Sequence, residues 1–154
     1  MQKQKLTVIG LALIFIVSAV AINAGDVAWF DLTNCAMCKS MNETEGLLDH
    51  MTWEQYDISN GVVSITSVTD DFKEAYKSCN AAMEAAGEKL MAGEKLPLCG
   101  SCMAFGGLMA KGTKVENVET MHGHVSIITG DNDELVAEIK AWSAKNNEEM
   151  KKFQ

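Results

Sequence analysis

The chain repeats one order of features at a spacing of roughly 60 residues, and this repeat limits the possible folds more than any other feature. In each copy a C-x-x-C pair comes first, a glycine before alternating apolar residues follows, and an amphipathic segment comes last. The pairs are Cys35/Cys38 and Cys99/Cys102, and the glycines are Gly61 and Gly123. A period of this length is too long for a solenoid. The sequence therefore predicts a tandem duplication, with unit one at about 33–92 and unit two at about 97–152.

Each unit is predicted to contain a β-hairpin. Residues 53–59 and 62–69 flank Asn60-Gly61, and Asn-Gly favours the type I′ turn whose twist matches that of paired strands. The second hairpin is expected at 114–121 and 124–129, around His122-Gly123. A lone hairpin is at best marginally stable, so the two are predicted to form one four-stranded antiparallel sheet. Residues 27–32 are a candidate for an added edge strand.

A helix is predicted before and after each hairpin, which gives an α+β fold of two α-β-β-α units in one domain, residues 25–154, with the helices covering the sheet. Each first helix is expected to begin at a C-x-x-C pair, capped in unit one by Thr33 or Asn34 and Gly-rich in unit two. The long helices are expected at about 70–89 and 132–152. Their apolar faces are Phe72, Tyr76, Cys79 and Met83 in the first, and Leu135, Ile139 and Trp142 in the second.

The N-terminus is typical of an export signal. Two lysines are followed by an apolar run from Leu6 to Ile22, and the small-x-small pattern at 19–21 and Ala24 are candidate cleavage points. Residues 1–24 are therefore predicted to be a signal helix, and the mature protein to be periplasmic or secreted, without membrane contact. The alternative is a membrane anchor formed by an uncleaved helix, because the apolar run is close to the shortest length that spans a bilayer.

The charge of the chain argues against nucleic-acid partners. The formal net charge is -8, it would become -10 after loss of residues 1–24, and the chain contains no arginine. An acidic chain without arginine lacks the electrostatic footprint of a nucleic-acid or anionic-membrane binder. The expected partner is a metal ion, and a protein partner stays an open possibility.

The two C-x-x-C pairs favour metal binding. Residues three apart on a helix share one face, and a thiolate near a helix N-terminus is favoured by the helix dipole. Four thiolates brought together by a duplicated fold would suit zinc or copper(I). The sequence therefore predicts a soft-metal protein for sequestration, delivery or sensing, with no catalytic residue assigned. The predicted ligands are Cys35, Cys38, Cys99 and Cys102, and the secondary candidates are Met41, His50, Cys79, His122 and His124.

Two other uses of the cysteines stay open. One is thiol–disulfide exchange, and the other is a binding module held by disulfides. Residues 27–32 and the first pair are similar to the strand, C-x-x-C and helix order of thioredoxin over about 25 residues. The only proline, Pro97, stands just before the second pair, and the following strands are predicted to form a tight hairpin. Because neither feature matches that fold, the chain is not assigned to the thioredoxin family.

Overall fold

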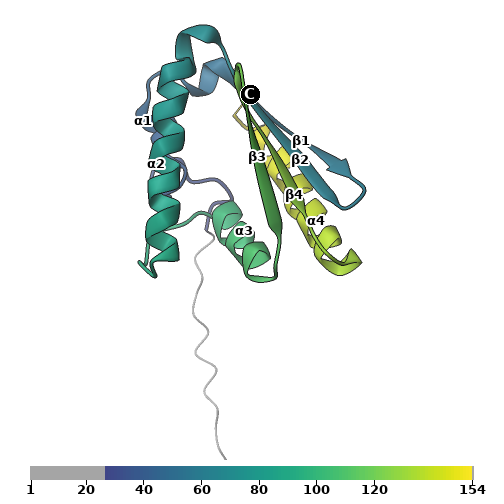
Figure 1. Ribbon diagram of the computed structural model, residues 1–154. Coiled ribbons are helices and arrows are strands. Elements are labelled where there is room, and N and C mark those ends of the chain that lie inside the picture. Colours follow the sequence, from purple (N-terminus) through teal and green to yellow (C-terminus); the bar gives the residue numbers. More distant parts are fainter. Residues whose placement is uncertain (1–26, 154) are drawn as a thin grey trace, which may run out of the picture.

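The computed structural model describes residues 27–153 and shows one antiparallel sheet with four α-helices (Figure 1). The strand order is β1-β2-β4-β3, so the two hairpins meet through β2 and β4. The strands are β1 (Met51–Ile58), β2 (Gly61–Val68), β3 (Lys114–Thr120) and β4 (Gly123–Thr129), and the helices are α1 (Lys39–Glu43), α2 (Lys73–Met91), α3 (Gly100–Ala110) and α4 (Asp133–Met150). The α+β class and the four-stranded sheet are confirmed. The predicted signal helix lies outside the described residues.

The sheet is symmetric in its register. Ser64 of β2 lies opposite Ser126 of β4, and the pairing continues for three residues on either side of this point. Each hairpin has a loop of two residues, because Ile58 pairs with Gly61 and Thr120 pairs with Gly123. The long predicted strands are therefore found at nearly the predicted positions, and the edges of the sheet are β1 and β3.

The prediction of a type I′ turn at Asn60-Gly61 is wrong. The loop residues are Ser59 and Asn60, and no described residue other than glycine has a positive φ, which a type I′ turn requires at both positions. Gly61 instead begins β2, where a Cβ atom would lie 1.9 Å from the carbonyl oxygen of Ile128 on β4. The glycine is needed there because the neighbouring backbone approaches so closely.

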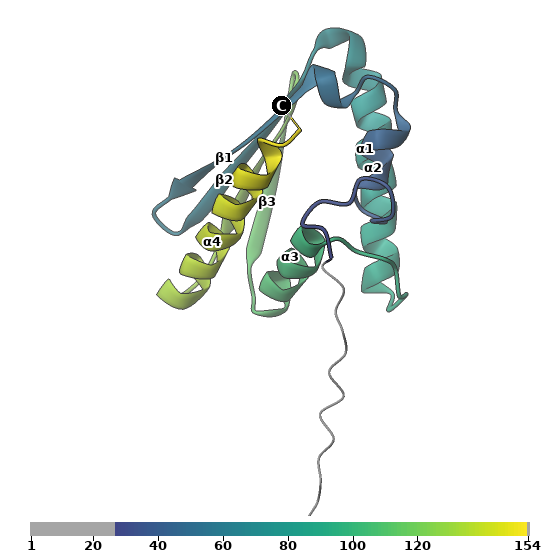
Figure 2. The same cartoon turned by 180° about the vertical axis from the view of Figure 1, so that it is seen from behind.

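One face of the sheet carries the main hydrophobic core. Helix α4 lies along this face and α3 packs against α4, as Figures 1 and 2 show from opposite sides. The core between them consists of Val62, Leu108, Ile128, Leu135 and Ile139. Helix α4 begins where the Asn132 side chain accepts a hydrogen bond from the backbone N–H of Leu135 at 2.9 Å. Among residues 27–153 no helix covers the opposite face, so within this range the prediction that helices cover the sheet holds for one face only.

Helix α2 stands at one end of the sheet and forms a second core there (Figures 1 and 2). Its predicted apolar face is confirmed: Tyr76 and Cys79 are buried, and Phe72 and Met83 pack against them. Leu47 and Val68 complete this cluster.

Within residues 27–153 no helix is both long enough and apolar enough to cross a membrane.

The predicted helix at the first Cys pair is wrong for most of its length. Residues 35–38 form a turn, α1 extends only from Lys39 to Glu43, and a 3₁₀ turn at Leu48–His50 leads into β1. Gly46, with φ +77°, interrupts the segment in a conformation that a helix does not contain. Thr33 and Asn34 are not caps, because α1 begins at Lys39 and Cys38 takes the N-cap position. Their backbone N–H groups instead donate to the Asp31 carboxylate at 2.9 and 2.8 Å.

The predicted edge strand at 27–32 is also wrong. This segment does not join the sheet. The carbonyl oxygens of Ala28 and Trp29 instead accept hydrogen bonds from the backbone N–H groups of Gly100 and Ser101, at 3.0 and 2.9 Å. These are first-turn N–H groups of α3, which have no acceptor within their own helix. The segment therefore caps the N-terminus of α3 with its carbonyl groups and does not extend the sheet.

Candidate metal centre

The four cysteines of the two C-x-x-C pairs come together in space. Their Sγ atoms all lie within 4.8 Å of one another. The Sγ of Cys102 is 3.7 Å from that of Cys35 and 3.5 Å from that of Cys38, and the Cys38–Cys99 distance is 3.8 Å. Four sulfurs around one zinc ion, each about 2.3 Å from it, stand about 3.8 Å apart in a regular tetrahedron. The sulfurs therefore already have nearly the spacing of a tetrahedral zinc site.

Backbone hydrogen bonds hold the two pairs against each other. The N–H of Ala36, between the first two cysteines, donates to the carbonyl of Pro97 at 2.9 Å. Cys99 is the residue before the first helical residue of α3, with extended backbone (φ -76°, ψ 170°), as predicted for the second pair. The first pair lies in the turn that Asp31 orders, and the N–H groups of Asn34 and Thr33 hold the pKa of Asp31 below its usual range. Each pair thus presents its sulfurs from a rigid backbone.

The centre is enclosed on most sides. Cys35 and Cys99 are each 1% exposed and Cys38 is 6% exposed, whereas Cys102 is only partly buried. The surrounding apolar side chains are Leu32, Met37, Met41 and Leu98. An apolar wall excludes water and strengthens metal–thiolate bonds, while the partly exposed Cys102 leaves one side open. The pattern is that of a shielded site with one accessible sulfur.

The thiols of the cluster differ in how readily they ionise. The pKa of Cys99 is strongly lowered, because its sulfur accepts hydrogen bonds from the Cys102 and Cys38 thiols and from the backbone N–H of Cys102. The pKa of Cys38 is strongly raised, because its thiol donates to the Cys102 and Cys99 sulfurs and is buried. The hydrogen bonds within the cluster therefore favour the thiolate form at Cys99. A bound cation would replace the protons shared among the other sulfurs, as metal binding at thiols generally does.

A buried polar network fixes α3 beneath the centre. Asn146 of α4 is 1% exposed and accepts hydrogen bonds from the Ser101 hydroxyl at 2.8 Å and the Trp29 indole N–H at 2.9 Å. Ser101 lies inside the second C-x-x-C pair, so the network ties that pair to α4. Sequence reasoning missed Asn146. Its position four residues after Trp142, on the apolar face of the predicted helix, was the available signal.

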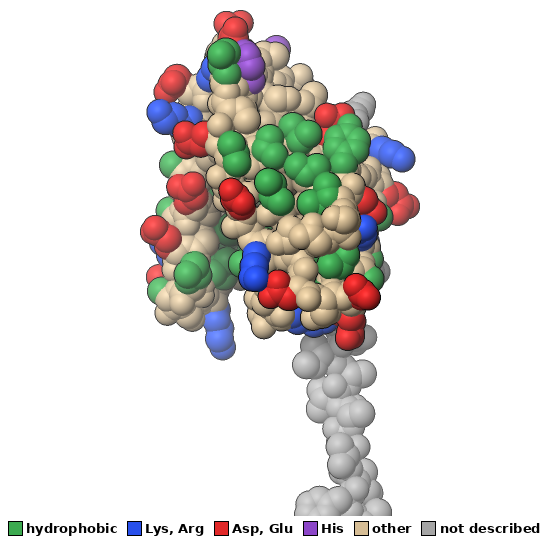
Figure 3. Space-filling view, turned by 45° about the vertical axis from the view of Figure 1, so that its right-hand side comes forward, with side chains coloured by type: hydrophobic (Ala, Val, Ile, Leu, Met, Phe, Trp, Pro, Cys, Tyr) green, Lys and Arg blue, Asp and Glu red, His purple; other side chains and the backbone are tan. Residues whose placement is uncertain are grey.

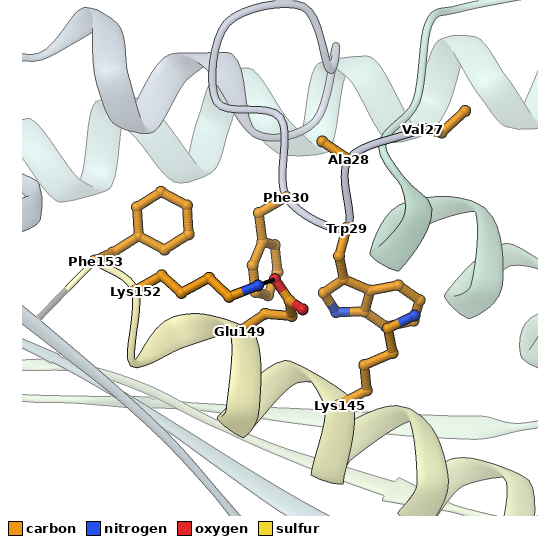
Figure 4. A pocket seen from close by; sticks show the side chains of 8 residues that line it. All are labelled: Val27, Ala28, Trp29, Phe30, Lys145, Glu149, Lys152 and Phe153. Atoms are coloured by element: carbon orange, nitrogen blue, oxygen red, sulfur yellow. Dashed lines mark hydrogen bonds and ion pairs between the residues drawn. The ribbon is translucent and has the colours of Figure 1, made fainter. Parts of the chain in front are cut away.

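A hollow of about 430 Å³ lies between residues 27–30 and the end of α4 (Figure 4). Phe30 and Phe153 face each other across it with ring centroids 6.1 Å apart, and Lys145 lies 4.0 Å from the centre of the Trp29 ring. Lys152 pairs with Glu149 at 2.5 Å. No cysteine lines this hollow, so it is separate from the sulfur cluster.

The secondary candidates lie outside the four-sulfur cluster. Met41 packs against both the cluster and the second core. The Sγ of Cys79 lies 3.3 Å from the Ser40 hydroxyl, and burial raises the pKa of this thiol.

The three histidine candidates have other partners. His50 stacks on Phe72 with ring centroids 4.2 Å apart, and His122 lies 3.1 Å from the Asp70 carboxylate. His124 is hydrogen-bonded to Tyr76. Among residues 27–153, only the four predicted cysteines form a group of three or more side chains that could bind one metal ion.

His124 makes the stability of the fold depend on pH. Burial lowers the pKa of His124 below 6.5, so the unfolded chain takes up a proton before the folded chain does. Stability is therefore full above about pH 6.5 and falls as the pH drops toward the folded pKa. Relative to His124→Gln, the wild-type free energy of unfolding should decline as the pH falls below about 7, where a histidine of the unfolded chain begins to take up its proton. Urea titrations of both chains measure this, and a difference that is constant with pH would contradict it.

Comparisons with known proteins give no relative. No family model matches the chain, and no curated protein and no solved structure is significantly similar to it. The chemistry available to this protein must therefore be read from the geometry of its own side chains.

Proposed function

We propose that Cys35, Cys38, Cys99 and Cys102 bind one soft metal ion, and that the protein sequesters, delivers or senses this metal outside the cytoplasm. The spacing of the sulfurs carries the proposal. Three distances between the two pairs lie between 3.5 and 3.8 Å, close to the edge of a zinc–sulfur tetrahedron. The symmetric register of β2 and β4 supports the accompanying inference that the two units arose by duplication.

Zinc is the first candidate and copper(I) the second. Four sulfurs in a tetrahedral arrangement are typical of zinc or of an iron–sulfur cluster, and zinc needs no further component. Copper(I) is favoured by soft thiolate and thioether ligands, and the Met37 and Met41 side chains pack against the cysteines. When bound, either ion would join the turn at 35–38 to the start of α3.

Export is part of the same proposal. The cationic and apolar pattern of residues 1–24 supports a cleaved signal, which would place the metal centre in the periplasm or outside the cell. The mass of the protein recovered from an exporting host tests this directly, since cleavage removes residues 1–24 and retention leaves the membrane-anchored alternative.

The decisive experiment is metal analysis of the protein purified under reducing conditions. We expect one equivalent of zinc or copper per chain, four thiols that react only after the metal is removed, and loss of the metal in Cys99→Ser/Cys102→Ser. Cys79→Ser is the matched control, because Cys79 is also buried but lies in the second core. This control should retain the full equivalent.

Two outcomes would contradict the proposal that the two pairs share one metal site. The first is metal below about one tenth of an equivalent, with all four thiols oxidised. The second is undiminished binding in Cys99→Ser/Cys102→Ser, which would show that one pair suffices. Either result would leave the sulfur cluster without the assigned role.

Thiol–disulfide exchange is the second candidate function. The lowered pKa of Cys99 favours it, because the thiolate is the species that attacks a disulfide. The burial of Cys99 opposes it, since a sulfur that is 1% exposed is out of reach of a protein disulfide. A mixed disulfide trapped at Cys99 by Cys102→Ser would support exchange over metal binding.

A further inference from the structure

The sheet face that no helix covers is apolar at its centre. Figure 3 shows hydrophobic side chains gathered into one continuous patch over this face, with acidic and lysine side chains around it. The strand register puts the following side chains on this face, which we call the open face: Tyr56, Val63, Ile65, Val118, Val125 and Ile127. Val63, Ile65, Val125 and Ile127 occupy the two central strands. Tyr56 and Val118 flank them on the edge strands and are 52% and 45% exposed.

Such a face is unusual for a sheet that faces water. An antiparallel sheet with one solvated face normally alternates apolar residues inward and polar residues outward. Here β2 carries Val62 on the core side but also Val63 and Ile65 on the open face. Continuous exposed apolar patches with a polar rim mark interaction sites in soluble proteins. The composition of the open face therefore fits a covered surface better than a solvated one.

The size of the open face suits the interface of a dimer. Four strands about 4.8 Å apart and seven residues long at about 3.3 Å per residue cover roughly 440 Å² before side-chain relief is added. Specific interfaces begin near about 600 Å² of accessible surface on each partner. The side chains project from the sheet, so the accessible surface of the open face is larger than this planar area and closer to about 600 Å². Two sheets that pack face to face, about 10 Å apart, are a common architecture.

The rim charges suit a second copy of the same chain. On the open face Glu54 of β1 and Glu116 of β3 stand on one diagonal, while Tyr56 and Val118 stand on the other. A twofold axis parallel to the sheet, along or across the strands, exchanges the two diagonals. Each glutamate then faces Tyr56 or Val118 of the other copy and not another carboxylate.

We propose that the protein is a homodimer in which two copies pack through their open faces. The interface is isologous, with the four β-branched side chains of the central strands at its core and the glutamates at its rim. No cysteine lies on the open face, so formation of the dimer does not depend on metal binding at the four cysteines. The net charge of -8 on each chain opposes association, so added salt should tighten the dimer.

The test uses the protein as an exporting host leaves it, with no further truncation. We expect light scattering and sedimentation to give twice the mass of one chain at micromolar concentrations, with a dissociation constant that falls as salt is added. Val118→Glu should weaken the dimer by at least about tenfold, because it adds two charges to the interface of the pair. Ile65→Glu, at the centre, should abolish the dimer.

Val115→Glu is the matched control. Val115 is on the same strand as Val118 and is 37% exposed, but it pairs with Ile128 and points to the opposite face of the sheet. This variant should dimerise like the wild type, with an unchanged circular dichroism spectrum. A wild-type chain that is monomeric up to about 1 mM would overturn the proposal and leave the open face to another protein. Equal weakening by Val118→Glu and Val115→Glu would overturn it too, because the contact would then lie elsewhere.

Discussion

Zinc should raise the free energy of unfolding of the reduced protein by about 4 kcal/mol when free zinc exceeds the dissociation constant about 1,000-fold. The reason is that the four sulfurs have the required spacing only in the folded chain. In the unfolded chain the two pairs are separated by more than 60 residues, so the complete site is lost. Urea unfolding at buffered zinc concentrations, with and without a chelator, measures the effect.

The stabilisation should be largest where the metal adds a link that the fold otherwise lacks. Residues 27–38 are tied to residues 97–101, just before and at the start of α3, by a few backbone hydrogen bonds, among them Ala36 to Pro97 and Gly100 to Ala28. Hydrogen exchange in this segment should therefore slow more than exchange in β2 or β4. This comparison places the effect at the cysteines and separates it from general stabilisation.

Two variants control the experiment. Cys79→Ser should keep the full zinc-dependent gain, and Cys99→Ser/Cys102→Ser should lose it, because only the latter removes sulfurs from the cluster. Equal gains in both variants would contradict the prediction, since zinc would then bind and stabilise the chain at some other place.

Gly61→Ala should lower the free energy of unfolding by about 3–5 kcal/mol, which is among the largest effects of a single substitution. A Cβ atom at this position would lie 1.9 Å from the carbonyl oxygen of Ile128 and 2.9 Å from the Cα of Thr129. Both are backbone atoms of β4, so no side chain can move aside. Relief of the clash requires β2 and β4 to separate at the contact that joins the two hairpins.

The matched control is Gly107→Ala in α3. A Cβ atom there has no neighbour within 4 Å, and alanine is favoured over glycine in a helix by up to about 1 kcal/mol. This variant should be slightly more stable than the wild type by chemical denaturation. If Gly61→Ala were also neutral or stabilising, the close pairing of β2 and β4 would be wrong.

The elements with long periodic patterns were predictable from the sequence. Helix α4 carries Leu135, Ile139 and Trp142 on one face and begins at a capping asparagine, so pattern and cap agree. The hairpins were placed within one or two residues, because side-chain alternation marks the strands, although both loops lie one residue before the predicted turn pairs. The turn type was not predictable. Glycine is required at position 61 by the close backbone of β4, more than 60 residues away, and not by the conformation of the hairpin loop.

The short elements around the first Cys pair were not predictable. Residues 35–38 were expected in a helix, but Asp31 accepts the neighbouring N–H groups and orders a turn. Such side-chain hydrogen bonds compete with helix formation over a few residues, where pattern carries little information. Segment 27–32 was expected as a strand, yet its carbonyls are used to complete α3. Both outcomes depend on contacts that a local pattern does not contain.

The sequence by itself determined which sulfurs are available, how they are paired along the chain and where the two hairpins lie. It did so because spacing of three residues and alternation of side chains are local properties. Only the tertiary structure decided that the four sulfurs meet, because that depends on long-range hydrogen bonds such as Ala36 to Pro97 and on the Asn146 network under α3. It also decided that α2 stands at the end of the sheet, which leaves the open face without a covering helix.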